Sequence, residues 1–218
     1  MIPLQFALRR RMMGAGGGDV PISELPLGAL INVGTDGGAG TPNYEIADKD
    51  NLVSGGVVLV RKNIYSKSAF GSTASYPDGT LDNLIKTTIY NEMPQQLRDK
   101  MMDVTFNLSS SGNITRKMFA LTYTMAGFGN NDGVAEGKAL QLYTSSASRV
   151  KTFNGSAAGW WLSSRYRSSS RACGVYTDGS VDYYGPAGGF GVVPAFAIPG
   201  DTLSKLIPNT DGSYNLIL

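Results

Sequence analysis

Polar and aromatic side chains suited to contacting a partner cluster between residues 165 and 184. Arginine, tyrosine and serine fill one continuous run there, which includes Ser170, and two more tyrosines follow an Asp-Gly pair. Tyrosine gives contact area at low entropic cost and serine adapts its hydrogen bonds, so this mixture is typical of recognition loops. The alternative is a solvated loop without a partner. We predict a ligand-binding surface formed by the following residues: Arg165, Tyr166, Arg167, Ser168, Ser169, Arg171, Tyr183 and Tyr184.

Catalytic chemistry finds little support in the composition. The 218 residues include no histidine and a single cysteine, which excludes Ser-His-Asp and Cys-His nucleophile systems as well as His-ligated and Cys-rich metal sites. Paired carboxylates need no histidine, but the 17 acidic residues form no recognisable motif. We therefore expect a protein that is not an enzyme and that uses no cofactor or metal.

Two isolated features have a chemical and a structural interpretation. The stretch NNDG offers Asn130, Asn131 and Asp132 as calcium ligands. Calcium takes about six to eight oxygen ligands, and this loop supplies few, so we favour a glycine-containing turn. Cys173 lies in an expected strand and is predicted to be a small buried residue.

Charge and hydropathy argue against nucleic acid and membranes as partners. The 19 basic and 17 acidic residues give a net charge of +2, too small for a nucleic-acid or membrane footprint across the whole protein. No apolar stretch approaches the roughly 20 residues needed to cross a bilayer, and the N-terminal sequence is a poor signal peptide. We expect synthesis in a cytoplasm, without nucleic-acid binding or membrane insertion.

Residues 1–18 differ in composition from the rest of the chain. A short apolar and basic stretch is followed by closely spaced glycines, which behave as a flexible linker. We predict an anchoring arm that binds other proteins, although a tail with a chance apolar composition is the alternative. The anchoring residues of this arm are predicted to be Leu4, Phe6, Leu8, Arg9, Arg10 and Arg11.

Hydrophobic periodicity predicts two helices in the first half of the chain. Residues 80–92 repeat their apolar positions at helical spacing, with Thr80 or Asp78 available as an N-cap. Pro94 is expected to open a second short helix with Leu97 and Met101 facing inward.

Strand patterns surround these helices. The strongest is GGVVLVRKNIY, because β-branched valines favour strands, and Asp178-Gly179 predicts a hairpin turn in residues 172–184. Residues 103–125 read as a second hairpin, GVVPAFAI as a buried strand interrupted by Pro194, and the final YNLIL as a strand able to pair with ALINV. Strands, two helices and then short strands with long loops indicate an α+β fold whose terminal strands lie close together.

The two adjacent tryptophans, Trp160 and Trp161, are predicted to belong to the core, since aromatic pairs bury large areas. A strand would point their rings to opposite faces, which leaves open that one of them is exposed.

Three segments together resemble an uncharacterised family of C-type-lectin-like domains found in gut bacteria and their phages. They read WWLSS, GVYTDGSV and GVVPAFAI, and DNLIKTTIYNEMPQQLRDKM is similar to the helical segment of that family. The resemblance covers about residues 25–200. It implies a C-type-lectin-like fold for residues 19–218. Ser163 and Val193 stand where the family usually has arginine, so any pairing of those arginines is lost here.

The resemblance and the composition lead to one functional expectation and one alternative. We expect a bacteriophage virion structural protein, a decoration or fibre component of head or tail, whose lectin-like domain binds a host-surface glycan or protein. The arm would attach it to other virion proteins, and a homo-oligomer is expected, with a trimer as one candidate arrangement. Alanine at Tyr166, Arg167 and Tyr184 should then abolish binding at unchanged melting temperature. The alternative is a non-viral bacterial carbohydrate- or protein-binding module.

Overall fold

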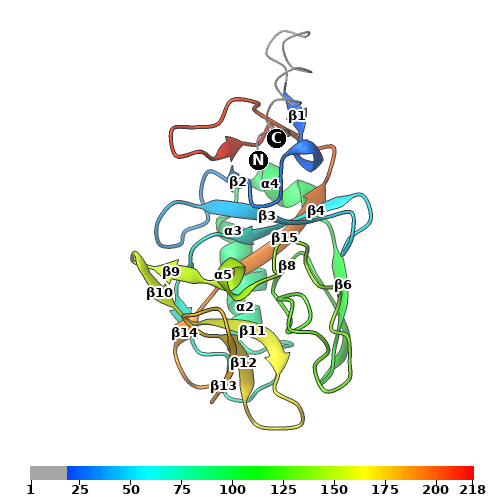
Figure 1. Cartoon of the computed structure of the whole chain (residues 1–218), viewed down its shortest axis with the longest axis vertical. Coiled ribbons are helices and arrows are strands. Elements are labelled where there is room, and N and C mark those ends of the chain that lie inside the picture. Colours follow the sequence, from blue (N-terminus) through cyan, green and yellow to red (C-terminus); the bar gives the residue numbers. More distant parts are fainter. Residues whose placement is uncertain (1–18) are drawn as a thin grey trace.

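The computed structural model describes residues 19–218, so the predicted anchoring arm lies outside the described residues. The described chain is mostly short strands with a few short helices, which confirms the α+β class (Figure 1).

A six-stranded sheet forms the part of the core nearest the C-terminus. Its central segment Gly56–Arg61 is buried along its whole length and contains three valines, which favour a pleated surface covered by other side chains. All neighbouring pairs in this sheet are antiparallel except β17 and β2. Its strands, in spatial order, are β17 (Tyr214–Asn215), β2 (Leu30–Asn32), β3 (Asn43–Lys49), β4 (Gly56–Arg61), β15 (Pro194–Pro199) and β8 (Met118–Ala120). Pro194 begins β15 rather than interrupting it, because proline is tolerated as the first residue of a strand.

The two ends of the described chain meet at one end of the molecule. Tyr214 of β17 lies opposite Ile31 of β2, which confirms the predicted pairing of the last strand with the first segment. Beside them, β1 (Val20–Pro21) pairs with β16 (Leu203–Ser204). Asp211 stabilises the turn that precedes β17. Hydrogen bonds from Ser213 and, to a smaller extent, from Asn43 lower the pKa of the Asp211 carboxyl to about 2.

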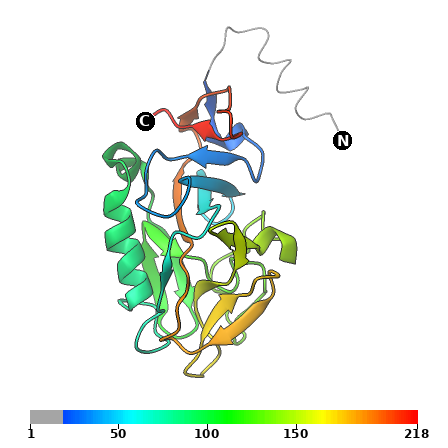
Figure 2. The same ribbon diagram turned by 90° about the vertical axis from the view of Figure 1, so that its left-hand side faces the viewer.

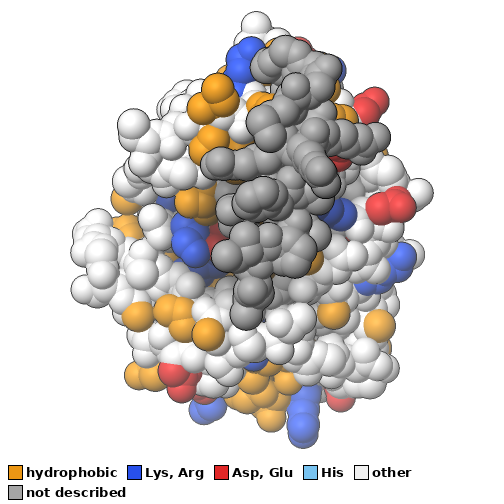
Figure 3. Space-filling view, turned by 45° about the horizontal axis from the view of Figure 1, so that its top comes forward, with side chains coloured by type: hydrophobic (Ala, Val, Ile, Leu, Met, Phe, Trp, Pro, Cys, Tyr) orange, Lys and Arg blue, Asp and Glu red, His pale blue; other side chains and the backbone are white. Residues whose placement is uncertain are grey.

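Exposed hydrophobic side chains gather in segments at this same end. Figure 3 looks toward it and shows hydrophobic side chains among polar ones on the surface drawn in colour. Ile207, in the loop between β16 and β17, is 80% exposed. Of the five exposed large hydrophobic residues in the described part of the chain, four belong to these segments, namely Leu27, Leu203, Ile207 and Leu218.

A five-stranded sheet lies at the opposite end of the molecule, away from the C-terminus (Figures 1 and 2). Residues 172–184 form the predicted hairpin at one edge of this sheet, with the positive φ of the turn at Gly179. In spatial order its strands are β13 (Val181–Tyr184), β12 (Ala172–Val175), β11 (Trp160–Arg165), β14 (Phe190–Gly191) and β5 (Lys67–Ser68).

The predicted helix over residues 80–92 is confirmed and lies along one side of the molecule, against β8 (Figure 2). The prediction that Thr80 or Asp78 is its N-cap is wrong, because Gly79 holds that position and no side chain caps the helix. Glycine is required there by space: an added Cβ would lie 2.6 Å from the carbonyl oxygen of Ser75.

This helix changes its hydrogen-bonding pattern along its length. It begins as α2 (Thr80–Asn83), continues as a π-helical segment (Leu84–Ile89) and ends as α3 (Tyr90–Glu92). The second predicted helix is α4 (Gln95–Lys100), with Leu97 and the following Met101 buried as expected. Pro94 is its N-cap rather than its first helical residue.

The remaining elements are small. These elements are β6 (Val104–Leu108) with β7 (Gly112–Arg116), β9 (Lys151–Phe153) with β10 (Ser156–Ala158), α5 (Ser146–Arg149) and a 3-10 turn at Ile22–Glu24. The predicted hairpin in residues 103–125 is present as the antiparallel pair β6 and β7, and β8 of the large sheet follows it.

Two buried ion pairs stiffen the large sheet. Arg61 and Asp36 are both buried and approach to 2.5 Å, and Tyr44 also donates a hydrogen bond to the Asp36 carboxylate. Lys151 pairs with Glu45, while burial lowers the pKa of the Lys151 ammonium. Buried charges of this kind are retained only with partners, because an isolated charge is costly to desolvate.

Both tryptophans are fully buried, so the expected core role is confirmed and neither ring is exposed. Adjacent residues of a strand point to opposite faces of the sheet, and neither tryptophan is exposed, so protein covers both faces of β11. The Trp160 indole N–H donates to the Arg149 carbonyl at 3.0 Å, and that of Trp161 donates to the Ser68 carbonyl at 2.9 Å. Trp161 therefore joins β11 to the last residue of β5.

Candidate ligand-binding site

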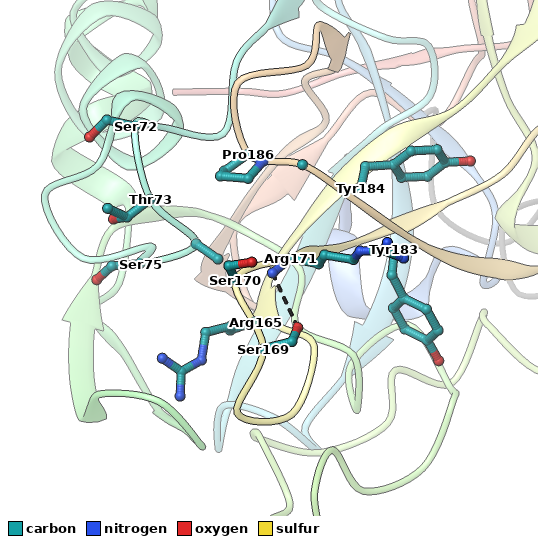
Figure 4. Close-up of a pocket in the computed structure, with 12 residues that line it drawn as sticks. Ser72, Thr73, Ser75, Arg165, Ser169, Ser170, Arg171, Tyr183, Tyr184 and Pro186 are labelled. Atoms are coloured by element: carbon teal, nitrogen blue, oxygen red, sulfur yellow. Dashed lines mark hydrogen bonds between the residues drawn. The ribbon is translucent and has the colours of Figure 1, made fainter.

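A surface hollow of about 780 Å³ lies beside the five-stranded sheet, and we call it the Arg171 pocket. One wall comes from the loop between β5 and α2, and the other comes from the loop after β11 and the end of β13 (Figure 4). Its lining consists of Ser72, Thr73, Ala74, Ser75, Arg165, Ser169, Ser170, Arg171, Tyr183, Tyr184, Gly185 and Pro186.

Backbone and indole contacts hold the two walls together. The Pro186 carbonyl accepts hydrogen bonds from the N–H groups of Phe70 and Gly71, at 2.8 and 3.2 Å. Beneath them Trp161 packs against Phe70, with ring centroids 5.6 Å apart, and also against Tyr184 at 6.2 Å. Segments more than 80 residues apart in sequence are thus fixed side by side.

The loop of residues 166–171 is closed by its own hydrogen bonds. The N–H of Tyr166 donates to the Arg171 carbonyl at 2.9 Å, while the Tyr166 carbonyl accepts from both the N–H and the hydroxyl of Ser169. The Ser169 hydroxyl in turn accepts from the Arg171 N–H at 3.1 Å, the contact drawn in Figure 4. This loop therefore presents its side chains from an ordered backbone.

The β12–β13 hairpin is positioned by its glycine turn. Gly179 has φ of +82°, and an added Cβ would lie 1.9 Å from the Ser146 carbonyl oxygen. The hairpin register places Tyr184 opposite Ala172 and Tyr183 opposite Cys173. Both tyrosines therefore lie on the strand that begins just after this tightly packed turn.

The tyrosine rings serve packing more than ligand contact. Tyr183 stacks on Tyr166 with centroids 3.5 Å apart, and Tyr184 packs on Phe190 at 4.2 Å. In Figure 4 the rings of Tyr183 and Tyr184 extend away from Ser72, Thr73 and Ser75.

Burial also changes the acidity of both phenols. It raises the pKa of Tyr183 to about 12. It raises the pKa of Tyr184 as well, with a further contribution from the hydrogen bond to Asp182. Both tyrosines are half-buried against the core, so the structure argues against the expectation that alanine at Tyr184 would leave the melting temperature unchanged.

Some of the predicted ligand-binding residues line a second, smaller hollow of about 290 Å³ instead of the Arg171 pocket. We call it the Asn131 pocket, and its lining consists of Tyr123, Asn130, Asn131, Asp132, Gly133, Tyr166, Arg167 and Tyr183. Arg165, Ser169, Arg171 and Tyr184 line the Arg171 pocket, whereas Tyr166 and Arg167 line only the second hollow. Tyr183 borders both hollows and Ser168 borders neither of the two.

The stretch NNDG is the predicted glycine-containing turn. The Asn131 amide points inward, where it donates to the Glu136 carboxylate at 3.1 Å and to the Arg165 carbonyl at 2.7 Å. Asp132 and Gly133 take positive φ. Within residues 19–218, no group of three or more acidic, cysteine or histidine residues is arranged to hold a metal ion.

Glu136 and Cys173 are buried neighbours of this region. The Glu136 carboxylate accepts hydrogen bonds from the Ser109 N–H and from the hydroxyl of Ser164, the residue before Arg165. It thereby ties the turn between β6 and β7 to the end of β11. Cys173 is fully buried in β12 as predicted, and burial raises the pKa of its thiol.

Sequence reasoning missed the wall formed by Ser72, Thr73 and Ser75. These residues belong to a serine-rich turn of ordinary composition, and only the fold brings them to the predicted loop. Glu136 was also missed, since a single acidic residue in a loop shows no pattern of burial.

A family model described as a domain of unknown function (DUF6273) matches residues 54–200. The chain belongs to this family. The DUF6273 segment includes every residue that lines the Arg171 pocket, whereas β1, β2, β3, β16 and β17 lie outside it. No curated protein and no solved structure matches the chain. Within residues 19–218, no helix has the length and apolar character needed to span a bilayer.

Proposed function

We propose that this chain is a recognition protein of a bacteriophage particle, a decoration or fibre component of head or tail that binds a host-surface glycan or protein through the Arg171 pocket. The observation behind this proposal is the convergence of Arg165, Ser169 and Arg171 with a second polar wall from a distant part of the chain. Concave sites with a few convergent polar groups are the usual places for ligands.

The placement of the pocket supports display from a particle. The described chain begins at β1, beside the C-terminus, whereas the five-stranded sheet lies at the opposite end (Figure 1). A protein attached through residues 1–18 would therefore hold the Arg171 pocket away from its attachment point. Exposed Leu203 and Ile207 at the attachment end offer apolar surface to neighbouring virion proteins.

The proposal includes a C-type-lectin-like fold and a homo-oligomeric assembly. Paired terminal segments, one main helix beside the sheet and a loop-rich outer region support this fold assignment. Repeated copies on one particle would raise the effective concentration of sites and convert weak contacts into avidity. The proposed place of the protein is the virion, after synthesis in the host cytoplasm.

A pair of blocking variants tests the binding proposal. Ser72 is exposed at the Arg171 pocket and Asn130 is exposed at the Asn131 pocket, so Ser72→Trp and Asn130→Trp each fill one hollow without changing charge. We expect Ser72→Trp to abolish binding of the full chain to host cells and Asn130→Trp to preserve it. Equal binding by both variants would overturn the assignment of the Arg171 pocket.

The virion part of the proposal needs a separate experiment. Mass spectrometry of purified particles should find peptides of this chain in stoichiometric amount. Detection only in the soluble cell fraction would contradict it and favour a non-viral bacterial binding module instead.

A further inference from the structure

We propose that the Arg171 pocket selects a saccharide bearing an oxyanion, either a carboxylate or a phosphate group, over its neutral counterpart. This inference rests on the proposed binding function of the same pocket. It concerns the chemical class of ligand, which the charge and hydrogen-bonding groups of the lining define.

The lining of the pocket contains two guanidinium groups and no carboxylate. Within residues 19–218, neither Arg165 nor Arg171 forms an ion pair. The Nε atom of Arg165 donates to the Arg167 carbonyl at 3.0 Å, which orients the guanidinium group. Its two terminal nitrogens stay available, and the planar fork of a guanidinium matches the geometry of a carboxylate or phosphate.

Neighbouring acidic groups are oriented toward other partners. The Asp182 carboxylate accepts hydrogen bonds from the Tyr184 hydroxyl and from the Tyr183 N–H, and Asp182 is not part of the lining. The Asn131 pocket differs, because it combines Asp132 with Arg167. Of these two hollows, only the Arg171 pocket therefore has a net positive lining.

Hydroxyl groups form the opposite wall. Ser72, Thr73 and Ser75 lie across the hollow from Arg171, and the single hydrogen bond drawn among the lining residues joins Ser169 to Arg171 (Figure 4). A hydroxyl both donates and accepts, so this wall complements the hydroxyls of a sugar ring. A lining that combines guanidinium groups with hydroxyls thus matches an acidic saccharide.

The aromatic groups argue for a saccharide rather than a nucleic acid. Proteins that bind single strands stack successive bases on exposed aromatic faces along a basic groove. Here Tyr183 is stacked on Tyr166 and Tyr184 is packed on Phe190. Both rings are therefore occupied by protein neighbours, which leaves the arginines and hydroxyls of the lining to contact a ligand.

Titration of the full chain with matched probes, followed by NMR, tests the inference. We expect glucuronate or glucose 6-phosphate to bind about tenfold more tightly than glucose, because a charged acceptor strengthens each guanidinium hydrogen bond. The carboxylate and phosphate probes distinguish the two sources of charge. Equal affinity for glucose, or no binding of either anionic sugar, would overturn the inference.

Two further probes limit the ligand class. Inorganic phosphate binding as tightly as glucose 6-phosphate would contradict a saccharide ligand. An oligonucleotide that binds more tightly than both sugars would replace the saccharide by nucleic acid.

Neighbouring arginines provide the matched variants. Arg171→Gln should remove the preference for the anionic sugar, whereas Arg167→Gln, with the same charge change in the same loop, should keep it. Arg165→Gln gives a second loss variant if Arg171→Gln disturbs the loop. If the preference is absent while Ser72→Trp still blocks binding to cells, the inference fails and the proposed function stands.

Discussion

Trp161 offers the sharpest test of how the fold positions the Arg171 pocket. Its indole N–H donates to the carbonyl of Ser68, the residue of β5 that leads into one wall. Its ring contacts Tyr184 in the other wall. Trp161→Phe removes this hydrogen bond and leaves unfilled space beneath both walls. We expect weaker ligand binding together with lower stability.

The loss of stability follows from two contributions. The missing hydrogen bond and the unpaired carbonyl cost about 1–3 kcal/mol. The lost ring atoms and the residual cavity add about 1–2 kcal/mol. Urea unfolding followed by circular dichroism should therefore show a decrease of ~2–5 kcal/mol in the free energy of unfolding.

Trp160→Phe is the matched control. Trp160 is equally buried and also donates to a carbonyl, but its partner is Arg149, away from the pocket. We expect a similar loss of stability and unchanged binding to host cells, measured at a temperature where both variants are folded. Equal losses of binding in both variants, or a change in stability below about 1 kcal/mol for Trp161→Phe, would show that Trp161 does not position the walls of the pocket.

Three further predictions concern the scaffold. Arg61→Met should lower the free energy of unfolding by about 3–5 kcal/mol, because it strands the buried Asp36 carboxylate; replacing both residues by apolar ones should cost less in the same urea assay. Gly179→Ala should cost clearly more than Gly212→Ala, since both positions have positive φ but only the first would clash with backbone; equal melting temperatures would contradict this. Asp211, with its pKa lowered to about 2, stabilises the fold above about pH 4 and loses this effect as the pH falls toward 2. Asp211→Asn should therefore reduce the dependence of the free energy of unfolding on pH between about pH 4 and pH 2.

Local patterns were sufficient for the elements defined by near neighbours in sequence. Consecutive valines predicted β4, helical spacing predicted residues 80–92, and Asp178-Gly179 predicted the hairpin. The N-cap could not be predicted, because Gly79 is selected by its distance from the Ser75 carbonyl rather than by a capping side chain.

One of the two walls of the candidate site depends on contacts between distant segments. The predicted loop is present as an ordered turn, but its opposite wall at Ser72–Ser75 lies about 90 residues earlier in the chain. Pairing of β11 with β14, and of β14 with β5, brings these walls together, and no local periodicity encodes it. Burial of both faces of β11 likewise depends on elements outside the strand.

The central claim is that the Arg171 pocket contacts the ligand. Amide chemical-shift mapping of the full chain with solubilised host-surface glycan tests it most directly. We expect the largest shifts at residues 72–75, 169–171 and 185, with small changes at residues 130–133. Largest shifts around the Asn131 pocket, or spread over the end that holds β1 and β16, would contradict it.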